Sequence, residues 1–498
     1  MAKYLKLFDT HTEYAAYISG QDSVKPNVSY CKDNDDVHYN PKTWANEYMQ
    51  TVALESGTIS FNIWRDMGTD LITSISYSTD NGETWTTTEN EDDKGDNLQI
   101  SVNVQAGDKV LWKGDAVQTG YYSDYEYGCS FFSSTCEFDA KGNVMSLVCG
   151  DEYDNVTTIS GTGQFAYLFS DCYNELECNI ANARDLVLPA TTLTDSCYAC
   201  MFYNCTSLIT APELPATTLA DSCYACMFYN CANLITAPEL PVTELTEYCY
   251  NTMFSGCTSL VTAPELPATE MTTYCYRNMF YGCTSLVNAP ELPATSLADS
   301  CYGYMFYGCT SLVTAPELPA TSASSACYES MFRSCTSLAN APELPATELD
   351  FDCYQYMFNG CTSLADAPNL PATTLSGSCY KYMFGSCTAL ASAPEISATT
   401  LAGNCCEGMF SGCTSLTSAP VLHASELVND CYKNMFKNCS SLNYIKAMFT
   451  TTPSTTYTNS WVSGVASSGT YVKKSGATYT TRGVNAIPNN WTIETASS

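Results

Sequence analysis

Apolar residues recur through the middle of the chain at fixed positions in a unit of 26 residues. A Met-Phe pair at residues 201–202 returns every 26 residues as far as 435–436, ten times in all, without insertion or deletion. In every unit, Cys lies four residues before and four after the Met, and Leu lies seven after it. An added residue in one unit would disturb its neighbours, so this constancy predicts a stack of equivalent units.

Within one unit, the apolar positions predict a helix. Cys223, Met227 and Cys231 are spaced i, i+4 and i+8, which lines one face of a helix, and aromatic residues beside them form a second row. The Pro residues of the segment that follows exclude a helix interior and suit a short extended piece. We therefore expect a solenoid of ten strand–turn–helix units over residues 188–446, in a chain of the α+β class.

The repeat also resembles a known family. Residues 188–208 read LPATTLTDSCYACMFYNCTSL, with a Met-Phe pair, a Cys three residues after the Phe and then a Leu. This arrangement is similar to the BspA-like leucine-rich repeats, over residues 186–445. The resemblance implies a leucine-rich-repeat solenoid with a non-enzymatic surface or adhesion role. The unit is longer here than in many relatives, which leaves the curvature of the stack open.

The segments that flank the array have a different character. Residues 156–187 contain a degenerate unit, which suits the capping that the end of a stack needs. Residues 51–155 alternate apolar and polar residues, as in TISFNIW and LQISVNV, and predict an Ig-like antiparallel β-sandwich. Residues 447–498 are rich in Thr and Ser and predict a small C-terminal β-module. Residues 1–50 read as a separate N-terminal segment that could anchor the protein.

No set of catalytic residues emerges from the sequence. Residues 78–85, STDNGETW, look like an Asp-box on an Asn-Gly hairpin turn, which is a structural motif and does not imply sialidase activity. The three histidines, His11, His38 and His423, are far apart and stand in no motif. The chain has no glycine-rich phosphate loop, no GxSxG and no HExxH. We therefore do not expect an enzyme.

The charge balance excludes one class of partner. The chain has 498 residues, with 20 Lys and Arg against 52 Asp and Glu, and a formal net charge of −32. Phosphate binding needs concentrated basic residues, so we do not expect nucleic acid as a partner. No stretch of 18 apolar residues occurs, so we expect no membrane insertion. The first residues, MAKYLKLFDTHTEY, contain no standard secretory signal.

The 29 cysteines are placed in a way that favours thiols over disulfides. On a helix, the two Cys of one unit would lie about 12 Å apart, and equivalent Cys of neighbouring helices about 8–10 Å apart. A disulfide needs Cα atoms within about 7 Å. We therefore expect a reduced ladder of small buried apolar residues, with inter-repeat disulfides as the alternative.

Two pairs of cysteines have the spacing of a zinc site. Cys197-x-x-Cys200 and Cys223-x-x-Cys226 could offer four thiolates to zinc. Both pairs fall inside predicted helices, and two of the four residues belong to the ladder. A structural role is therefore the favoured interpretation, and we expect no resident cofactor.

A column of acidic residues is the weak candidate for a metal site. On adjacent parallel strands, its carboxylates would repeat about every 4.8 Å, where like charges repel by nearly 1 kcal/mol per pair in water. Such a row is either well solvated, which we favour, or neutralised by a shared cation such as Ca²⁺. The candidate ligands are Glu213, Glu239, Glu265, Glu291, Glu317 and Glu343.

Variation between the units concentrates just before and just after the Met-Phe pair. Tyrosines gather at these positions in two columns, and a row of aromatic residues on an extended face could bind a glycan or a protein. The first column contains Tyr203, Tyr229, Tyr281 and Tyr307, and the second contains Tyr304, Tyr356 and Tyr382.

These observations lead to two alternatives for the function. The layout of head, array and tail resembles leucine-rich-repeat proteins of gut Bacteroidota and of their phages. Virions assemble in a reducing cytoplasm, so the expected thiols and the absent signal favour a phage virion surface protein: a fibre, decoration or host-attachment protein. Its partners would be other virion proteins or a host cell-surface protein or glycan, and it could form a homo-oligomer. The alternative is a BspA-like adhesin, at the bacterial cell surface or extracellular.

Overall fold

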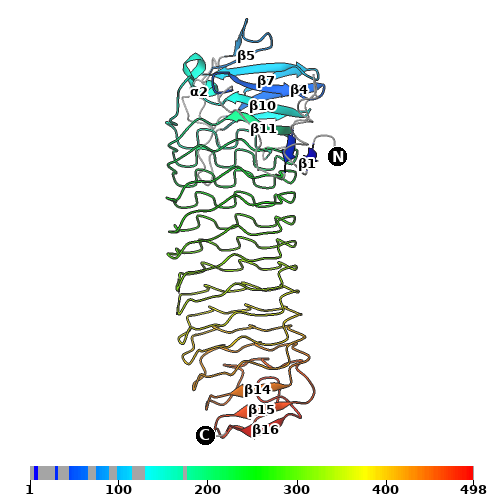
Figure 1. Ribbon diagram of the computed structural model, residues 1–498, viewed down its shortest axis with the longest axis vertical. Coiled ribbons are helices and arrows are strands. Elements are labelled where there is room, and N and C mark those ends of the chain that lie inside the picture. The colour runs from blue at the N-terminus through cyan, green and yellow to red at the C-terminus, as the bar shows by residue number, and fades with distance from the viewer. Residues whose placement is uncertain are drawn as a thin grey trace.

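The structure is a computed structural model of an elongated molecule, in which coils of chain are stacked between two ends that contain the longer strands (Figure 1). It describes residues 5–8, 28–31, 44–64, 74–88, 98–114, 129–171 and 176–496. The head contains the strands β1 to β10, and β14 to β16 lie at the opposite end of the stack (Figure 1).

The expected boundary at residue 50 lies inside a strand. β1 (Leu5–Phe8) and β2 (Val28–Cys31) form a two-stranded parallel sheet within the segment 1–50. β3 (Met49–Ala53) begins in the same segment and belongs to the main sheet of the head. The last residues of the segment are therefore part of the head.

Two sheets make up the rest of the head. One has six strands in the order β11-β10-β3-β8-β5-β6, and the other has three strands in the order β7-β4-β9. The bounds of the further strands are β4 (Gly57–Trp64), β5 (Ile75–Ser78), β6 (Thr86–Thr88), β7 (Leu98–Val104), β8 (Lys109–Gly114), β9 (Cys129–Ser134), β10 (Phe138–Asn143) and β11 (Ile180–Val187).

Aromatic side chains of the two sheets pack against one another. Phe132 of β9 lies 4.9 Å from Phe61 of β4 and 5.4 Å from Trp112 of β8, measured between ring centroids, and all three residues are buried. The indole N–H of Trp112 donates to the hydroxyl of Thr51 at 3.0 Å, which satisfies the one polar group of the cluster. The alternating pattern of β4 thus supplies an apolar layer between the sheets.

The head and the repeats share one core. β11 pairs in parallel with β10 of the head, and Asn182 of β11 forms a parallel bridge with Thr210 of the first repeat. The ring of Phe169, in the degenerate unit, lies 5.3 Å from Phe132 of the head and 5.3 Å from Phe202 of the first repeat. The sheet and the core therefore continue across residue 155, where we expected a domain boundary.

The helices that we expected in the repeats are absent, and that prediction is wrong. Across the described ranges, the helices are α2 (Ser146–Cys149) and the 3₁₀ helix η2 (Gly150–Glu152), and both precede the repeats. The repeat fold consists of turns, extended pieces and short parallel strands.

Backbone hydrogen bonds alternate between two directions along the segment expected to be helical. Tyr198 donates its N–H to the carbonyl of Cys223 in the next coil, at 3.0 Å, and the next residue, Ala199, donates to Ser196 three residues back, also at 3.0 Å. The same alternation continues along each segment and recurs in the following coils. An α-helix satisfies its backbone within itself, whereas here about half of these donors hold neighbouring coils together.

Every fourth residue of the segment has a left-handed backbone. In the second repeat these residues are Ser222 (φ 56°), Cys226 (φ 55°) and Asn230 (φ 56°). The residues that follow them are Cys223, Met227 and Cys231 of the repeat pattern, and all three are fully buried. The i, i+4, i+8 face is therefore the buried face, as predicted, but it belongs to a period of four residues and not to the 3.6 of a helix.

The extended pieces form ladders of parallel bridges from coil to coil. One ladder runs through Thr210, Thr236 and Thr262, at intervals of 26 residues, and continues along the array. A second ladder includes two short strands, β12 (Ser322–Ala323) and β13 (Glu348–Leu349). The expected short strand of each unit is thus reduced mostly to single bridges.

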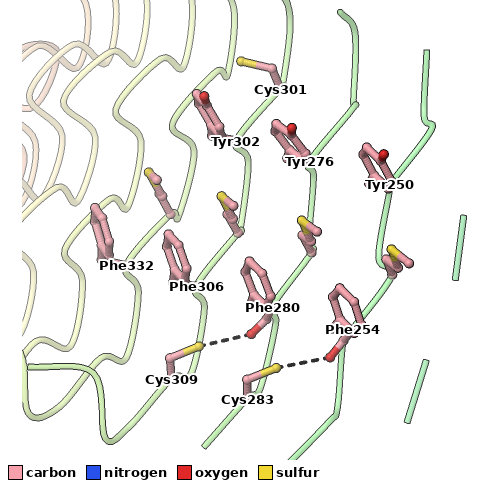
Figure 2. Packing of buried hydrophobic residues seen from close by; sticks show 14 of the residues in the cluster. Tyr250, Phe254, Tyr276, Phe280, Cys283, Cys301, Tyr302, Phe306, Cys309 and Phe332 are labelled. Carbon is pink, nitrogen blue, oxygen red and sulfur yellow. Dashed lines mark hydrogen bonds between the residues drawn. The ribbon is translucent and has the colours of Figure 1, made fainter. Parts of the chain in front are cut away.

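Identical side chains stack on one another in the core of the array (Figure 2). The rings of Phe254 and Phe280 lie 5.7 Å apart, nearly parallel at 4°, and those of Tyr250 and Tyr276 lie 5.8 Å apart at 8°. Aromatic pairs stabilise by about 0.5–1.5 kcal/mol beyond the area that they bury. An insertion in one coil would shift its ring out of the row, which explains the constant length of the repeat.

The tail continues the stack. β14 (Tyr444–Ala447), β15 (Thr470–Lys473) and β16 (Thr492–Thr495) form a parallel sheet, and Tyr444 of β14, at the end of the tenth repeat, bridges to Ser418 of the ninth. Trp461 stands 26 residues after Met435, the last Met of the repeat pattern, and is fully buried. The strands that we expected of the C-terminal module therefore prolong the ladder of the repeats.

Candidate recognition surface

The cysteines of the core are thiols with a defined hydrogen bond. In the described repeats, the Cys four residues after each Met points into the core and is fully buried. Its Sγ donates to the carbonyl of the Phe in the preceding coil, as from Cys309 to Phe280 at 3.1 Å (Figure 2). Burial raises the pKa of the Cys309 thiol to about 12. These thiols are protonated and shielded from solvent, which indicates a structural role and not a reactive one.

The four cysteines considered for zinc separate into two environments. Cys197 and Cys223 are fully buried members of the core, and burial raises the pKa of both thiols. Cys226 is only partly buried, and a hydrogen bond from Cys200 lowers the pKa of its thiol. Within the ranges that the structure describes, no group of three or more His, Cys, Asp or Glu side chains could hold a metal ion.

The column of glutamates proposed for a cation lies on the surface. All six candidates, Glu213, Glu239, Glu265, Glu291, Glu317 and Glu343, are exposed. Partial burial raises the pKa of the Glu213 carboxyl, the charge of Glu239 raises it further, and Arg184 opposes both. A role for Ca²⁺ at this column stays a prediction.

The tyrosines of the two candidate columns stack from coil to coil. They lie on the outside of the repeats, and most of them are half-buried because their faces cover one another. Those of the first column each precede a residue with left-handed backbone, whereas Tyr304, Tyr356 and Tyr382 adopt that backbone themselves. The stacked pairs and their ring-centroid distances are Tyr203–Tyr229 at 4.6 Å, Tyr281–Tyr307 at 4.6 Å and Tyr356–Tyr382 at 5.3 Å.

Two arginines join the columns into one surface, which sequence reasoning missed. The guanidinium of Arg277 lies 5.3 Å from the ring of Tyr274 and 5.0 Å from that of Tyr304. The guanidinium of Arg333 lies 5.5 Å from the ring of Tyr307 and 4.7 Å from that of Tyr356. Each arginine is therefore held between rings of different coils by cation–π contacts.

These arginines and the tyrosines that they contact form a continuous surface, which we call the tyrosine–cation strip. A third column adds a stacked pair to it, Tyr248 and Tyr274, whose rings lie 4.7 Å apart. The strip consists of Tyr248, Tyr274, Arg277, Tyr304, Tyr307, Arg333, Tyr356 and Tyr382. In the sequence, a Tyr and an Arg about one repeat length apart were the signal for this strip. Only the stacking of the coils brings such residues into contact.

Ion pairs extend this surface toward the tail. Glu407 lies between two lysines, with Lys381 Nζ at 3.4 Å from one carboxylate oxygen and Lys433 Nζ at 3.2 Å from the other. A hydrogen bond from Lys433 to Glu407 and the charge of that carboxylate raise the pKa of Lys433. The three side chains carry a net positive charge.

The Asp-box of the head is a structural turn. Asn81 (φ 61°) and Gly82 (φ 88°) form its tip, the N–H of Gly82 donates to the hydroxyl of Ser78 at 2.9 Å, and the N–H of Thr84 donates to Asp80 Oδ1 at 2.9 Å. Hydrogen bonds to the Asp80 carboxylate from the hydroxyl and the N–H of Thr84 and from the hydroxyl of Ser78 lower the pKa of Asp80 to about 2. Every oxygen in this network already has a partner within the turn.

A comparison with family models decides the family of the chain. The model for the BspA type leucine rich repeat region matches with six copies, over residues 167–312, 254–347 and 352–462. The chain belongs to this family. The resemblance seen in the sequence is thereby confirmed.

Other comparisons with this BspA-type repeat protein add no relatives. No curated protein and no solved structure matches the chain. In the part of the chain that the structure describes, no helix has the length and apolar character needed to cross a bilayer.

Proposed function

We propose that this BspA-type repeat protein is a non-enzymatic recognition protein on the surface of a phage virion, as a fibre, decoration or host-attachment protein. The family suggests a surface or adhesin-like role for the repeats. In this proposal the repeats form a solenoid of ten units, the head is a β-sandwich that docks the protein to the particle, and the solenoid displays its outer face to a host protein or glycan.

The observation that carries the proposal is the contrast between the inside and the outside of the coils. Inner positions repeat nearly the same residues in every coil, because the stacked core requires it. Outer positions around the Met-Phe pair differ from coil to coil, and there the tyrosines and arginines gather. Tyr and Arg dominate the binding energy of many interfaces. A face that the fold leaves free to vary, yet which concentrates these residues, favours recognition.

The virion location is supported by the thiols of the core. A protein that assembles in a reducing cytoplasm keeps its cysteines as thiols, and the core cysteines donate hydrogen bonds as thiols. A BspA-like adhesin on a bacterial cell is equally compatible with the family.

Locating the protein separates the two alternatives. Particles and cell envelopes from one culture are purified, and peptides of residues 188–446 are quantified in both by mass spectrometry. Enrichment in particles, together with loss of host adsorption after treatment with antibody against the repeats, supports the virion proposal. Enrichment in envelopes without particles would replace it with the adhesin.

A further inference from the structure

We propose that the tyrosine–cation strip, together with the lysines that follow it along the stack, binds a linear acidic polysaccharide with its carboxylates on these cations. This inference rests on the proposed recognition function and specifies the chemical class of its ligand.

Charge is segregated between the faces of the array. Residues 188–445 contain five Lys and Arg, and all five stand either two residues before or two residues after a Met of the repeat. Of the 21 Asp and Glu in the same range, only Glu329 and Glu407 stand at these positions. An anionic ligand therefore finds its opposite charge on one face only. The five cations are Arg277, Arg333, Lys381, Lys433 and Lys437.

The cations recur at a regular interval along the stack. They belong to the coils of Met279, Met331, Met383 and Met435, which are every second coil. Parallel strands are spaced by about 4.8 Å, so cations of alternate coils lie about 10 Å apart along the stack. This interval is comparable with the length of a disaccharide unit in an extended polysaccharide. A polymer with one carboxylate in each disaccharide would therefore place one carboxylate next to each coil that carries a cation.

The strip is continuous, as a polymer site requires. Contacts run from Arg277 to Tyr304, from Tyr304 to Tyr307 at 6.2 Å, and from Tyr307 to Arg333. They continue through Tyr356 to Tyr382, whose hydroxyl accepts a hydrogen bond from Asn434 in the tenth repeat, at 3.4 Å. Lys381 and Lys433 flank the end of this path.

The polar groups of the strip suit sugars and carboxylates. Stacked rings cover each other's faces, so they offer their edges and hydroxyls, which can hydrogen-bond to the hydroxyls of a sugar chain. The hydroxyl of Tyr304 already donates to Glu329, and burial and this bond raise its pKa to about 12, so it stays protonated and can accept a hydrogen bond from a sugar hydroxyl. The planar guanidinium of a stacked Arg can bind a carboxylate through two parallel hydrogen bonds. An extended acidic peptide presents the carboxylates of one face about every 7 Å, which does not match the interval of the cations.

The net charge of −32 sets the salt dependence of such binding. At physiological ionic strength, the Debye length of about 8 Å screens the acidic faces from a polymer on the strip, while contacts at the strip persist. Binding should therefore be strongest at moderate salt: long-range repulsion weakens it at low salt, and screening of the contacts weakens it at high salt.

The test measures binding of the full chain to defined polymers by biolayer interferometry. The probes are three carboxylated polysaccharides (polygalacturonate, alginate and hyaluronan), neutral dextran and the acidic peptide poly-glutamate. We expect at least one carboxylated polysaccharide to bind at least tenfold more tightly than dextran and poly-glutamate. The double variant R277A/R333A should weaken that binding at least tenfold, and R277K/R333K, which keeps the charge but loses the planar group, should weaken it less.

A matched control removes the same charge elsewhere. K446A/K474A changes two lysines outside the strip and should bind as the unchanged protein does, and thermal melts confirm that each variant is folded. Binding of poly-glutamate or dextran as tight as that of the polysaccharides, equal losses in both double variants, or no binding of any carboxylated polysaccharide would each overturn the inference. The proposed virion function fails separately, by absence of the protein from purified particles.

Discussion

The thiol of Cys283 donates a hydrogen bond to the carbonyl of Phe254, 3.1 Å away in the preceding coil (Figure 2). The same carbonyl also accepts the N–H of Cys257, so both of its lone pairs are used. Equivalent Cys-to-Phe bonds recur from Cys231 to Cys439, at 2.9–3.1 Å. The cysteines expected to be apolar filler therefore also connect the coils.

Replacing Cys283 with Ala should lower the free energy of unfolding by about 1–3 kcal/mol. The change removes one hydrogen bond, worth about 1 kcal/mol, and leaves a small cavity in a packed core. Urea unfolding followed by circular dichroism measures the loss. Cys226→Ala is the comparison, because that residue is only partly buried and its loss should be less than half as large. Equal stability of C283A and the unchanged protein would show that the bond contributes nothing.

Removing one ring from the aromatic row should destabilise the protein more than removing the Cys283 thiol. Phe306 is fully buried, with Phe280 and Phe332 stacked on either side at 5.7 and 5.6 Å. Phe306→Ala should lower the free energy of unfolding by about 3–5 kcal/mol, the usual range for a buried Phe. Val313→Ala, whose side chain is 46% exposed, should stay within about 0.5 kcal/mol of the unchanged protein. Similar losses for the two variants in urea unfolding would contradict the stacked core.

Replacing Gly282 with Ala should change the stability in opposite directions for the observed backbone and for a helix. Gly282 has φ 71°, and a Cβ built there meets no atom within 4 Å. Gly282→Ala should therefore destabilise by about 1 kcal/mol, from backbone strain alone. In a helix interior the same change would stabilise by about 1 kcal/mol. Thermal melts of Gly282→Ala and of the unchanged protein decide between these signs. Gly107→Ala is the comparison, because Gly107 in the head also has a positive φ and no atom within 4 Å of an added Cβ.

The buried face of each repeat could be predicted from the sequence, but its backbone could not. Cys, Met and Cys at intervals of four residues lie on one side of a helix and equally on one side of a ribbon of turns, because so short a segment hardly separates a period of 3.6 from one of four. The informative signal was the residue before each of them, such as Asn230 or Gly308, where a left-handed backbone is favoured. Tyr304 and Tyr356 also adopt it, and nothing in their residue type predicts that.

The candidate surface was predictable only in part, for a related reason. The two tyrosine columns follow from the interval of 26 residues, since stacking places equivalent residues side by side. The contact of Arg277 with Tyr304 joins different columns of neighbouring coils, so it depends on how the turns orient the side chains. The sequence pattern fixes which residues are outside, but not which of them touch.

Alkaline pH should unfold the array, because its buried thiols must keep their protons. Burial raises the pKa of Cys249 and Cys361 from 9.0 to about 12, and that of Cys275 to about 11. Between pH 9 and 12 the unfolded chain has lost these protons and the folded chain keeps them. The folded state then binds more protons, so its stability is complete below pH 9 and falls as the pH rises, by about 1.4 kcal/mol per pH unit for each thiol.

Many such thiols act together, so we expect cooperative unfolding that begins just above pH 9. Near-ultraviolet circular dichroism against pH measures the transition, and urea unfolding at pH 8 and at pH 10 measures the change in stability between them. The double variant C275A/C361A removes two of the groups and should show a smaller loss of stability between those two pH values. A native signal that persists to pH 12 would mean that the core does not hold its cysteines as buried thiols.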